Sequence, residues 1–293
     1  MTMIVITGAT GKLGGAVAEL LLERITATEL GVSVRDPERA DALAERGVRV
    51  RRGDYDDAAS LRHAFEGASK ILMISSNSGG ARIVEQHRTV IDAARAAGVR
   101  HVVYTSHMGA NADSAFAPMR GHAATEALLH ASGLAFTSLR NGFYADSALQ
   151  IMGGALETGS IVRPADGPVS WTAHADLAEA AATALTGDGE LSGITPPLTA
   201  SAALDLADIA AIASNLTGRE IGRSVISDDE YRAGALERVM PEASADMYLG
   251  LFVASRNGEF AAVDPALEKL LGRPPAPMRD VLQHWISNER SNP

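Results

Sequence analysis

The sequence predicts an α/β protein, and two observations support that prediction. Short runs of β-branched and apolar residues alternate with amphipathic helical segments through the first half of the chain. A glycine-rich turn at residues 8–14 follows the first of these runs and opens the first helical segment. Such alternation produces βαβ units and a parallel sheet with helices on both faces. We therefore expect a doubly wound parallel-sheet Rossmann fold with a smaller C-terminal substrate lobe.

The expected elements follow in order along the chain. Strands are expected at residues 3–7, 31–35, 48–52, 70–75, 100–105 and 134–139. Helices are expected at residues 13–24, 37–46, 58–65, 82–97, 120–131 and 175–185, and later at 204–216, 229–239 and 245–253. The stretches 264–272 and 278–286, joined by a proline-rich turn, are expected to form a docked cap. Glycine and proline become more frequent after residue 187. We therefore divide the chain into an NAD(P)-binding Rossmann domain at 1–186 and a mainly helical lobe at 187–293, which packs on the core and is not an independent domain.

The glycine turn reads Gly8-Ala9-Thr10-Gly11-Lys12-Leu13-Gly14. Glycines in this context permit a tight turn, let backbone N–H groups approach a pyrophosphate, and let the helix pack closely on the strand. The helix then presents the positive end of its dipole to the anion. The spacing Gly-x-x-Gly-x-x-Gly, in place of the Gly-x-Gly-x-x-Gly of dehydrogenases, indicates the short-chain reductase superfamily. The turn predicts a bound dinucleotide, and a tight turn without a ligand is the alternative.

Arg35 ends the second expected strand, where NAD-binding proteins place an acid for the ribose 2′-hydroxyl. An arginine there suits the 2′-phosphate of NADP, which it can hold with two parallel charge-assisted hydrogen bonds. Asp36 comes next and would take the NAD position if the strand ran one residue longer. We expect NADP(H), with a solvated strand end as the other interpretation of Arg35.

Two further strand ends carry polar side chains. Asp54 follows the third strand and could accept a hydrogen bond from the adenine amine, although Asp54 or Asp56 could equally cap the next helix. Ser75 and Ser76 follow the fourth strand. They could flank the cofactor ribose, because the carboxyl ends of parallel strands line the ligand crevice. A plain turn is the alternative.

The composition disfavours several other classes of protein. The absence of cysteine excludes disulfides, thiolate nucleophiles and zinc–thiolate sites, and the histidines are too dispersed to predict a metal site. A net charge of -10 disfavours nucleic-acid binding, and Arg49, Arg51 and Arg52 form one solvated strand face. The chain has no apolar run of about 18 residues and no signal-peptide pattern, so we expect a cytoplasmic protein without a membrane span.

Most short-chain reductases donate a proton through a Tyr-x-x-x-Lys pair. Here none of the five tyrosines is followed by a lysine four residues later, and the lysines are Lys12, Lys70 and Lys269. The helix after the fifth strand instead carries His122 and Glu126, one turn apart on the same face. Glu126 either orients His122 or lies on the surface. The usual catalytic pair is missing.

Seven segments of the chain resemble one family in order. They are VITGATGKLG, VRDPER, RRGDYDD, ILMISS, QHRTVIDAARAAGVRHVVYTS, HAATE and TSLRNGFY. Together they resemble the NmrA-like atypical short-chain dehydrogenases/reductases, most of all the NADPH-dependent quinone oxidoreductase 2 and triphenylmethane reductase subgroups. The resemblance covers residues 3–186 well and the remainder only loosely.

The resemblance implies which residues bind and act. NADP(H) would be bound by Gly8, Thr10, Gly11, Lys12, Leu13, Arg35, Asp54, Ser75, Ser76, Tyr104, Thr105, Ser106, His122, Asn141 and Phe143. The catalytic candidates are His122, Asn141 and Tyr144. The loop at 141–144 offers an amide and two aromatic rings to a planar substrate, whereas a turn former and ordinary packing are the alternatives. His107 is a second candidate proton source.

The expected function is hydride transfer from NADPH to a quinone or a similar planar, electron-poor small molecule. A quinone that accepts hydride becomes a stabilised phenolate-like anion, so it needs less help from an acid than a ketone does. The alternative is an NADP-binding redox sensor that regulates a partner without turnover, a role that the family includes. Epimerase chemistry relies on the missing pair. The acceptor, and the choice between a monomer and a homodimer, stay open.

Overall fold

The protein is described here by a computed structural model covering residues 3–187 and 191–291. It divides into two compact units. Unit 1 comprises Met1–Ala112, Gly121–Asn141 and His174–Pro196, and unit 2 comprises Asp113–Arg120, Gly142–Ala173 and Pro197–Pro293. The expected single division at residue 186 stays a prediction, and the structure groups residues 113–120 and 142–173 with the later part of the chain.

Unit 1 is built on a seven-stranded sheet with the order β3-β2-β1-β4-β5-β6-β10. Its strands are β1 Met3–Thr7, β2 Leu30–Val34, β3 Arg49–Arg52, β4 Ala68–Met73, β5 His101–His107, β6 Ala135–Asn141 and β10 Gly193–Ile194. Every pair in the sheet is parallel. The first six strands have the order of a doubly wound Rossmann sheet, which confirms the predicted fold class.

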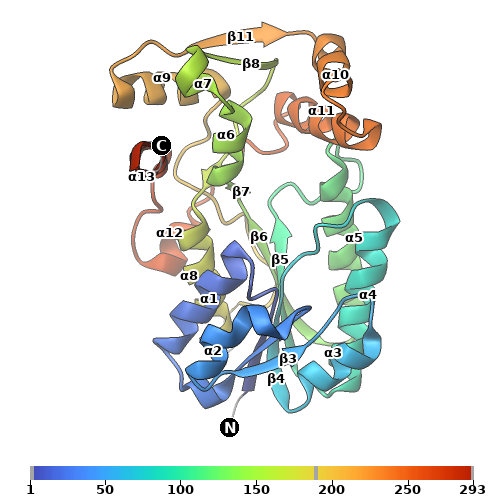
Figure 1. The fold of residues 1–293 in the computed structure, drawn as a ribbon. Coiled ribbons are helices and arrows are strands. Elements are labelled where there is room, and N and C mark those ends of the chain that lie inside the picture. The colour runs from blue at the N-terminus through green and yellow to red at the C-terminus, as the bar shows by residue number, and fades with distance from the viewer. Residues whose placement is uncertain (1–2, 188–190, 292–293) are drawn as a thin grey trace. The chain divides into compact units, whose positions relative to one another are not determined.

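Helices cover both faces of this sheet. They are α1 Lys12–Leu22, α2 Asp41–Glu45, α3 Ala58–Phe65, α4 Gly80–Ala96, α5 Ala117–Ala131 and α8 His174–Thr186. Helices α1 and α8 pack together on one face, and α3 and α4 pack together on the other (Figure 1). Because both faces are covered, β2 is buried along its whole length. The expected helix at 37–46 is instead a 3-10 turn, Pro37–Ala40, followed by the short helix α2.

The strand order fixes where a ligand can bind in unit 1. The order reverses between β1 and β4, and in open α/β sheets ligands bind outside the carboxyl ends of the strands at such a reversal. The glycine turn follows β1, and the loop that begins at Ile74 follows β4. These two segments are therefore the first place to look for a site.

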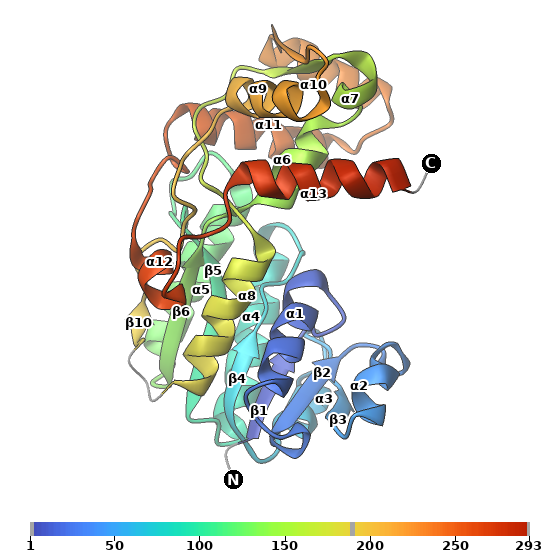
Figure 2. The same cartoon turned by 90° about the vertical axis from the view of Figure 1, so that its left-hand side faces the viewer.

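Unit 2 combines helices with two small parallel sheets. Its elements are β7 Phe143–Tyr144, α6 Ala145–Met152, α7 Ala155–Thr158, β8 Ser160–Pro164, β9 Trp171–Thr172, α9 Leu206–Thr217, β11 Gly222–Ile226, α10 Asp228–Glu237, α11 Glu242–Arg256, α12 Ala266–Leu271 and α13 Met278–Ser291. Strand β8 pairs with β11, and β7 pairs with β9. Helix α13 packs on α6 and α9, as Figure 2 shows. The sequence predicted α9, α10 and α11, but it predicted neither α12 and α13 as helices nor these short strands.

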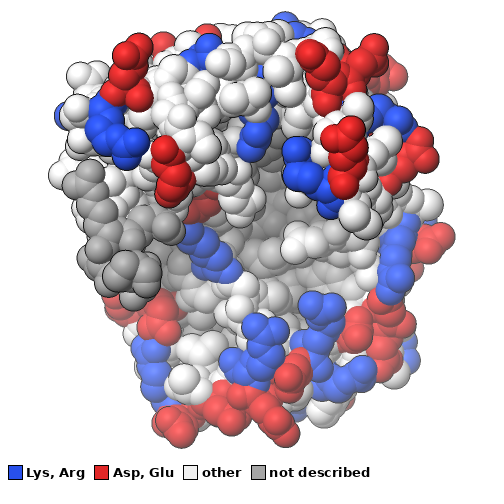
Figure 3. Space-filling model, turned by 45° about the horizontal axis from the view of Figure 1, so that its top comes forward, with Lys and Arg blue, Asp and Glu red and all other residues white. Residues whose placement is uncertain are grey.

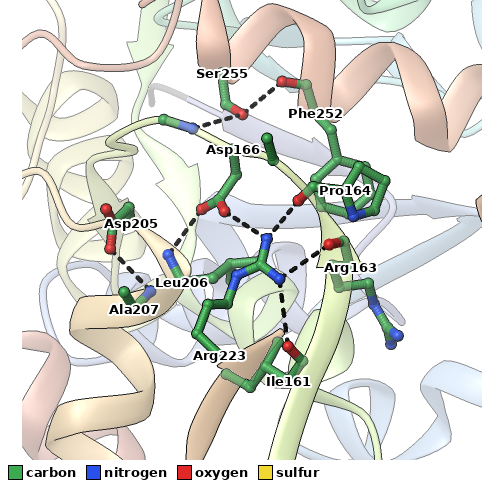
Figure 4. A network of polar contacts seen from close by, with 12 residues as sticks. Ile161, Arg163, Pro164, Asp166, Asp205, Leu206, Ala207, Arg223, Phe252 and Ser255 are labelled. Carbon is green, nitrogen blue, oxygen red and sulfur yellow. Dashed lines mark hydrogen bonds and ion pairs between the residues drawn. The ribbon is translucent and has the colours of Figure 1, made fainter. Parts of the chain in front are cut away.

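A buried arginine organises one corner of unit 2 (Figure 4). Arg223 on β11 donates to the Arg163 carbonyl at 2.9 Å and to Asp166 Oδ1 at 2.8 Å. The other carboxylate oxygen of Asp166 accepts the Leu206 N–H at the start of α9, at 2.8 Å. The pair is only 10% and 12% exposed, and each charge is hydrogen-bonded to the backbone as well. It therefore ties β8, β11 and α9 together as a structural element.

Among the helices of residues 3–187 and 191–291, none is both long enough and apolar enough to cross a membrane.

Candidate active site

The glycine turn has the geometry of a phosphate cradle. Gly8 has a φ of +64°, a left-handed conformation that favours glycine. A Cβ on Gly14 would lie 2.4 Å from the Gly8 carbonyl oxygen, so α1 packs directly on the turn. Thr10, Gly11 and Lys12 are exposed, whereas the side chain of Leu13 is buried. Thus Leu13 can offer a ligand only its backbone, and the turn fits the diphosphate expected of a dinucleotide.

The side chains after β2 and β3 lie at neighbouring strand ends. Strand β2 ends at Val34, so Arg35 is the first residue after the strand, and both Arg35 and Asp36 are exposed. The strand does not run on to Asp36, which favours the NADP interpretation. After β3, Asp54 accepts the N–H of Asp56 at 3.1 Å. The cap of α3 is Asp57, which accepts the N–H groups of Ala59 and Ser60, so the expectation that Asp54 or Asp56 caps this helix was wrong.

Side chains from other elements fix the loop after β4. Three successive backbone N–H groups each donate to a side chain: Ile74 to Thr7 Oγ1 at 2.9 Å, Ser75 to Thr105 Oγ1 at 2.8 Å, and Ser76 to His87 Nε2 at 2.9 Å. The Tyr55 hydroxyl donates to the Ile74 carbonyl at 2.7 Å. The loop is therefore held rigidly at the edge of the sheet where the cofactor is expected.

Tyr104 and His122 form a hydrogen-bonded pair within unit 1. The Tyr104 hydroxyl lies 2.8 Å from His122 Nδ1. Burial raises the pKa of Tyr104 above its usual range, so the phenol stays protonated. Burial also lowers the pKa of His122 to about 4, although the charge of Glu126 opposes this effect. Both side chains are neutral at neutral pH, and the pair offers hydrogen bonds without carrying a charge.

His107, at the end of β5, lies beside this pair. Its ring centroid is 5.9 Å from that of His122. His107 Nδ1 accepts the N–H of Gly109 at 3.0 Å, so in the neutral ring the proton is on Nε2. Burial and the neighbouring His122 hold the pKa of His107 well below its usual range. Neither histidine is therefore a protonated acid at neutral pH.

Asn141 ends β6 directly beside His107, its register partner on β5. The Asn141 side chain is 1% exposed, and neither its amide nitrogen nor its oxygen has a hydrogen-bond partner among the described residues. A buried amide without partners is costly and rare. Since an amide both donates and accepts, a ligand with both kinds of group would satisfy it.

Glu126 has a different role from the two that the sequence suggested. Its carboxylate is 5% exposed and binds Arg140, with the Nη2–Oε2 distance 2.7 Å. It also accepts the hydroxyls of Ser106 at 2.8 Å and Ser138 at 2.9 Å. It neither hydrogen-bonds His122 nor lies on the surface. Glu126 instead joins α5 to the carboxyl ends of β5 and β6, and it uses the Ser106 hydroxyl that was expected to face the cofactor.

Phe143 and Tyr144 belong to unit 2. The Phe143 ring is 8% exposed and packs edge-on against Trp171 and Phe260, with centroids 5.3 and 5.2 Å away. This favours packing, the alternative that the sequence left open. Tyr144 is half-buried and precedes the first turn of α6. A role for either ring at the cofactor or the substrate stays a prediction.

The strand ends of unit 1 therefore bring together most of the predicted residues: the glycine turn, Ser75, Ser76, Tyr104, Thr105, His122 and Asn141. Sequence reasoning missed His87, Gln86 and Arg140. For His87 a signal existed: the buried residues Ile83, His87, Val90, Ile91 and Ala94 share one face of α4. A histidine on that face points towards the sheet.

Within residues 3–187 and 191–291, no group of three or more His, Asp or Glu side chains could hold a metal ion.

Comparison with known proteins shows the family to which the chain belongs. A profile of NAD(P)H-binding proteins matches residues 8–188. Quinone oxidoreductase 2 of Escherichia coli is 36% identical over 97% of this chain and 99% of its own. Its crystal structure with NADPH matches with a TM-score of 0.91, at 35% identity over 97% of this chain and 100% of that one.

Two further proteins are similar over nearly the whole length. Triphenylmethane reductase of Citrobacter sp., solved with NADP(H), matches with a TM-score of 0.88, at 33% identity over 96% of this chain and 99% of its own. An NmrA-like family domain-containing oxidoreductase of Aspergillus flavus is 31% identical over 98% of this chain and 96% of its own. The glycine cradle and the amide of Asn141 fit the dinucleotide that the two solved relatives contain.

Proposed function

Since this chain belongs to the NmrA-like family of NAD(P)H-binding oxidoreductases, we propose that it reduces a quinone or a similar planar, electron-poor molecule without a Tyr-x-x-x-Lys pair. NADPH, when bound, supplies the hydride. Two relatives of similar identity are named for a quinone and for triphenylmethane, and a second structure of the latter is described as acting on triphenylmethane dyes. The chain's own residues hold the cofactor and meet the negative charge that develops on the acceptor.

The observation that carries this proposal is a group of uncharged polar side chains on β5, β6 and α5. Tyr104, His122 and His107 keep their neutral forms, and Asn141 has an unused amide. A ketone reductase needs a group that surrenders a proton in the transition state. A quinone becomes a delocalised anion on accepting hydride, and hydrogen bonds from uncharged groups in a buried site stabilise such an anion. Its protonation can follow from water.

The orientation of His122 suits this role. We propose that the phenol of Tyr104 donates to His122 Nδ1, which lies 2.8 Å from the phenol oxygen, because a protonated phenol can donate and a neutral imidazole nitrogen can accept. The neutral imidazole then carries its proton on Nε2, as a hydrogen-bond donor that is not used by Tyr104. Tyr104 would thus act as the residue that sets the tautomer of His122.

The test is NADPH oxidation by the purified protein with and without a simple benzoquinone or a triphenylmethane dye, with NADH in parallel. We expect acceptor-dependent oxidation with a preference for NADPH. The turnover number should be flat from about pH 6 to about pH 9, because neither His122 nor Tyr104 titrates in that range. A turnover number that falls as the pH rises, with a midpoint near pH 6.5, would show that a protonated histidine acts as an acid.

The role of His122 as a hydrogen-bond donor to the acceptor can be tested with one variant and a matched control. His122→Leu should lower the turnover number about tenfold, the loss expected for about one hydrogen bond. His130→Leu is the control, since His130 lies on the same helix, α5, and is exposed. Tight binding of NADPH without any acceptor-dependent oxidation would instead favour the redox sensor.

The charge pattern suits a small uncharged acceptor better than a polyanion. On the face shown in Figure 3, the described Lys and Arg side chains are interspersed with Asp and Glu side chains, and the net charge is -10. A polyanion is bound through a continuous field of one sign. We propose small-molecule chemistry for this protein on that basis as well.

A further inference from the structure

We infer that His87, together with Gln86, is a positioning residue for the cofactor. As a neutral imidazole it fixes the backbone of the loop after β4 and joins that loop to α5, the helix that carries His122. The inference rests on the proposed contact between this loop and the cofactor, and it does not depend on which acceptor is reduced.

The hydrogen bonds of His87 determine its tautomer. The backbone N–H of Ser76 can only donate, so His87 Nε2, at 2.9 Å, must accept. In a neutral ring the proton then lies on Nδ1, which donates to Thr125 Oγ1 at 2.7 Å. The Thr125 hydroxyl in turn donates to the Gly121 carbonyl at 2.8 Å. The chain of donors therefore has one direction, from Ser76 through His87 into α5, and a protonated ring would break it at Ser76.

Gln86 holds the same loop from the adjacent position on α4. Its side-chain oxygen accepts the Ser76 hydroxyl at 2.6 Å, and its nitrogen donates to both Asp56 oxygens at 3.0 and 3.1 Å. Hydrogen bonds from Arg82 and Gln86 keep the pKa of Asp56 below its usual range, so this acceptor stays ionised. Gln86 and His87 thus link the loops after β3 and β4 to each other and to α5.

Packing gives His87 no access to a ligand. Its side chain is 0% exposed. The ring lies between Tyr55 and Tyr104, with centroid distances of 6.2 and 5.5 Å and edge-on geometry. Both tyrosines contact the site directly, since Tyr55 binds the Ile74 carbonyl and Tyr104 binds His122. His87 can therefore act only through the groups that it holds.

The arrangement gives the loop a defined chemical character. The N–H groups of Ile74, Ser75 and Ser76 are all used inside the protein. The Ser76 hydroxyl is used as well, because it donates to Gln86 and accepts the N–H of Ser78 at 3.1 Å. At Ile74, Ser75 and Ser76 the backbone therefore offers a ligand carbonyl acceptors, because the three N–H groups are already used. Such a surface suits the hydroxyl groups of a ribose and disfavours a phosphate.

The experiment compares NADPH affinity, measured by the fluorescence of the bound cofactor, in three variants. His87→Leu leaves the Ser76 N–H without an acceptor and frees the loop, so we expect the dissociation constant to rise about tenfold. His87→Gln places an amide oxygen near the position of Nε2 and should recover affinity to within about threefold of the original. At saturating NADPH the turnover number of both variants should stay within about threefold, because the residues proposed to meet the acceptor are unchanged.

His101→Leu is the matched control. His101 begins β5 at the opposite end of the strand, is partly buried, and its Nε2 lies 2.9 Å from Thr137 Oγ1. The substitution His101→Leu removes a similar hydrogen bond from the same unit, so it should lower the thermal stability of the protein without changing its affinity for NADPH. If His87→Leu does not fold, Gln86→Leu takes its place with the same expected loss of affinity.

Two results would overturn the inference. One is an unchanged dissociation constant in His87→Leu with a loss of stability equal to that of His101→Leu, which would make His87 a structural residue only. The other is equal loss of affinity in His87→Gln and His87→Leu. Because the binding measurement needs no acceptor, a protein without quinone reductase activity would refute the proposed function and leave this test intact.

Discussion

The neutral state of His87 has a consequence for stability that can be calculated from the structure. Burial, together with a smaller effect of the nearby His122, lowers the pKa of His87 from an ordinary 6.5 to about 3. Below about pH 6.5 the imidazole of His87 therefore binds a proton in the unfolded chain, whereas in the folded chain it stays neutral. Since the unfolded state binds more protons, the free energy of unfolding falls as the pH falls through this range and is constant above it.

The size of the effect follows from the two pKa values. At about pH 5, protonation of one ordinary histidine favours the unfolded chain by about 2 kcal/mol relative to about pH 7.5. A folded-state pKa near 3 leaves His87 almost entirely neutral at that pH. In His87→Gln this contribution disappears, because glutamine does not titrate. The variant also loses the hydrogen bond to Thr125, at a constant cost of about 1 kcal/mol.

Urea unfolding of both proteins at about pH 7.5 and about pH 5 tests the argument. We expect His87→Gln to be less stable than the original protein at the higher pH and at least as stable at the lower one. His101, His107 and His122 also have lowered pKa values, but they are present in both proteins and cancel in the comparison. A stability difference between the two proteins that is the same at both pH values would refute the assignment of a neutral His87.

Three other predictions concern single residues. Arg35→Ser should raise the KM for NADPH about 10- to 100-fold in steady-state assays and leave the KM for NADH within about twofold, since only NADPH has the 2′-phosphate. Equal effects on the KM values of both cofactors would contradict this. Asn141→Leu removes a buried amide without partners, so chemical denaturation should show equal or greater stability while the turnover number falls at least about tenfold; a loss of stability with full activity would count against a ligand role. Val239 has a φ of 60° at the end of α10 and is 88% exposed, so Val239→Gly should raise the free energy of unfolding by about 1 kcal/mol in a urea titration, whereas Val263→Gly, at another exposed valine, should not.

Much of unit 1 could be predicted from the sequence because its signals are local. The strands are short apolar runs, and the turn after β1 has glycines where the backbone needs them, as the φ of Gly8 and the close approach at Gly14 show. The strand order then follows from the connection rules for parallel sheets. In unit 2 the strands β7 and β9 contain two residues each, too few for any periodicity to be recognised.

The partners of charged residues could not be predicted, because they depend on contacts between distant segments. Arg49 and Arg51 were expected to form a solvated strand face. In the structure Arg49 donates to the carbonyls of Glu66 at 2.7 Å and Ala64 at 3.0 Å, and Arg51 binds the Glu66 carboxylate at 2.9 Å. Both arginines satisfy the last turn of α3 and the residue after it. Alternation along β3 shows which side chains share a face, but not what that face meets.

Asn141 shows where the two kinds of reasoning meet. From the sequence it was either a turn former or a ligand contact, and nothing local decided between them. The structure buries it, while Ser106, Ser138 and Glu126 close by are all hydrogen-bonded. A buried amide that is left unsatisfied while these groups are all satisfied departs from the rule that buried polar groups are paired, and such departures are expected at functional sites. The unsatisfied amide is therefore stronger support for a ligand role at the end of β6 than any motif in the sequence.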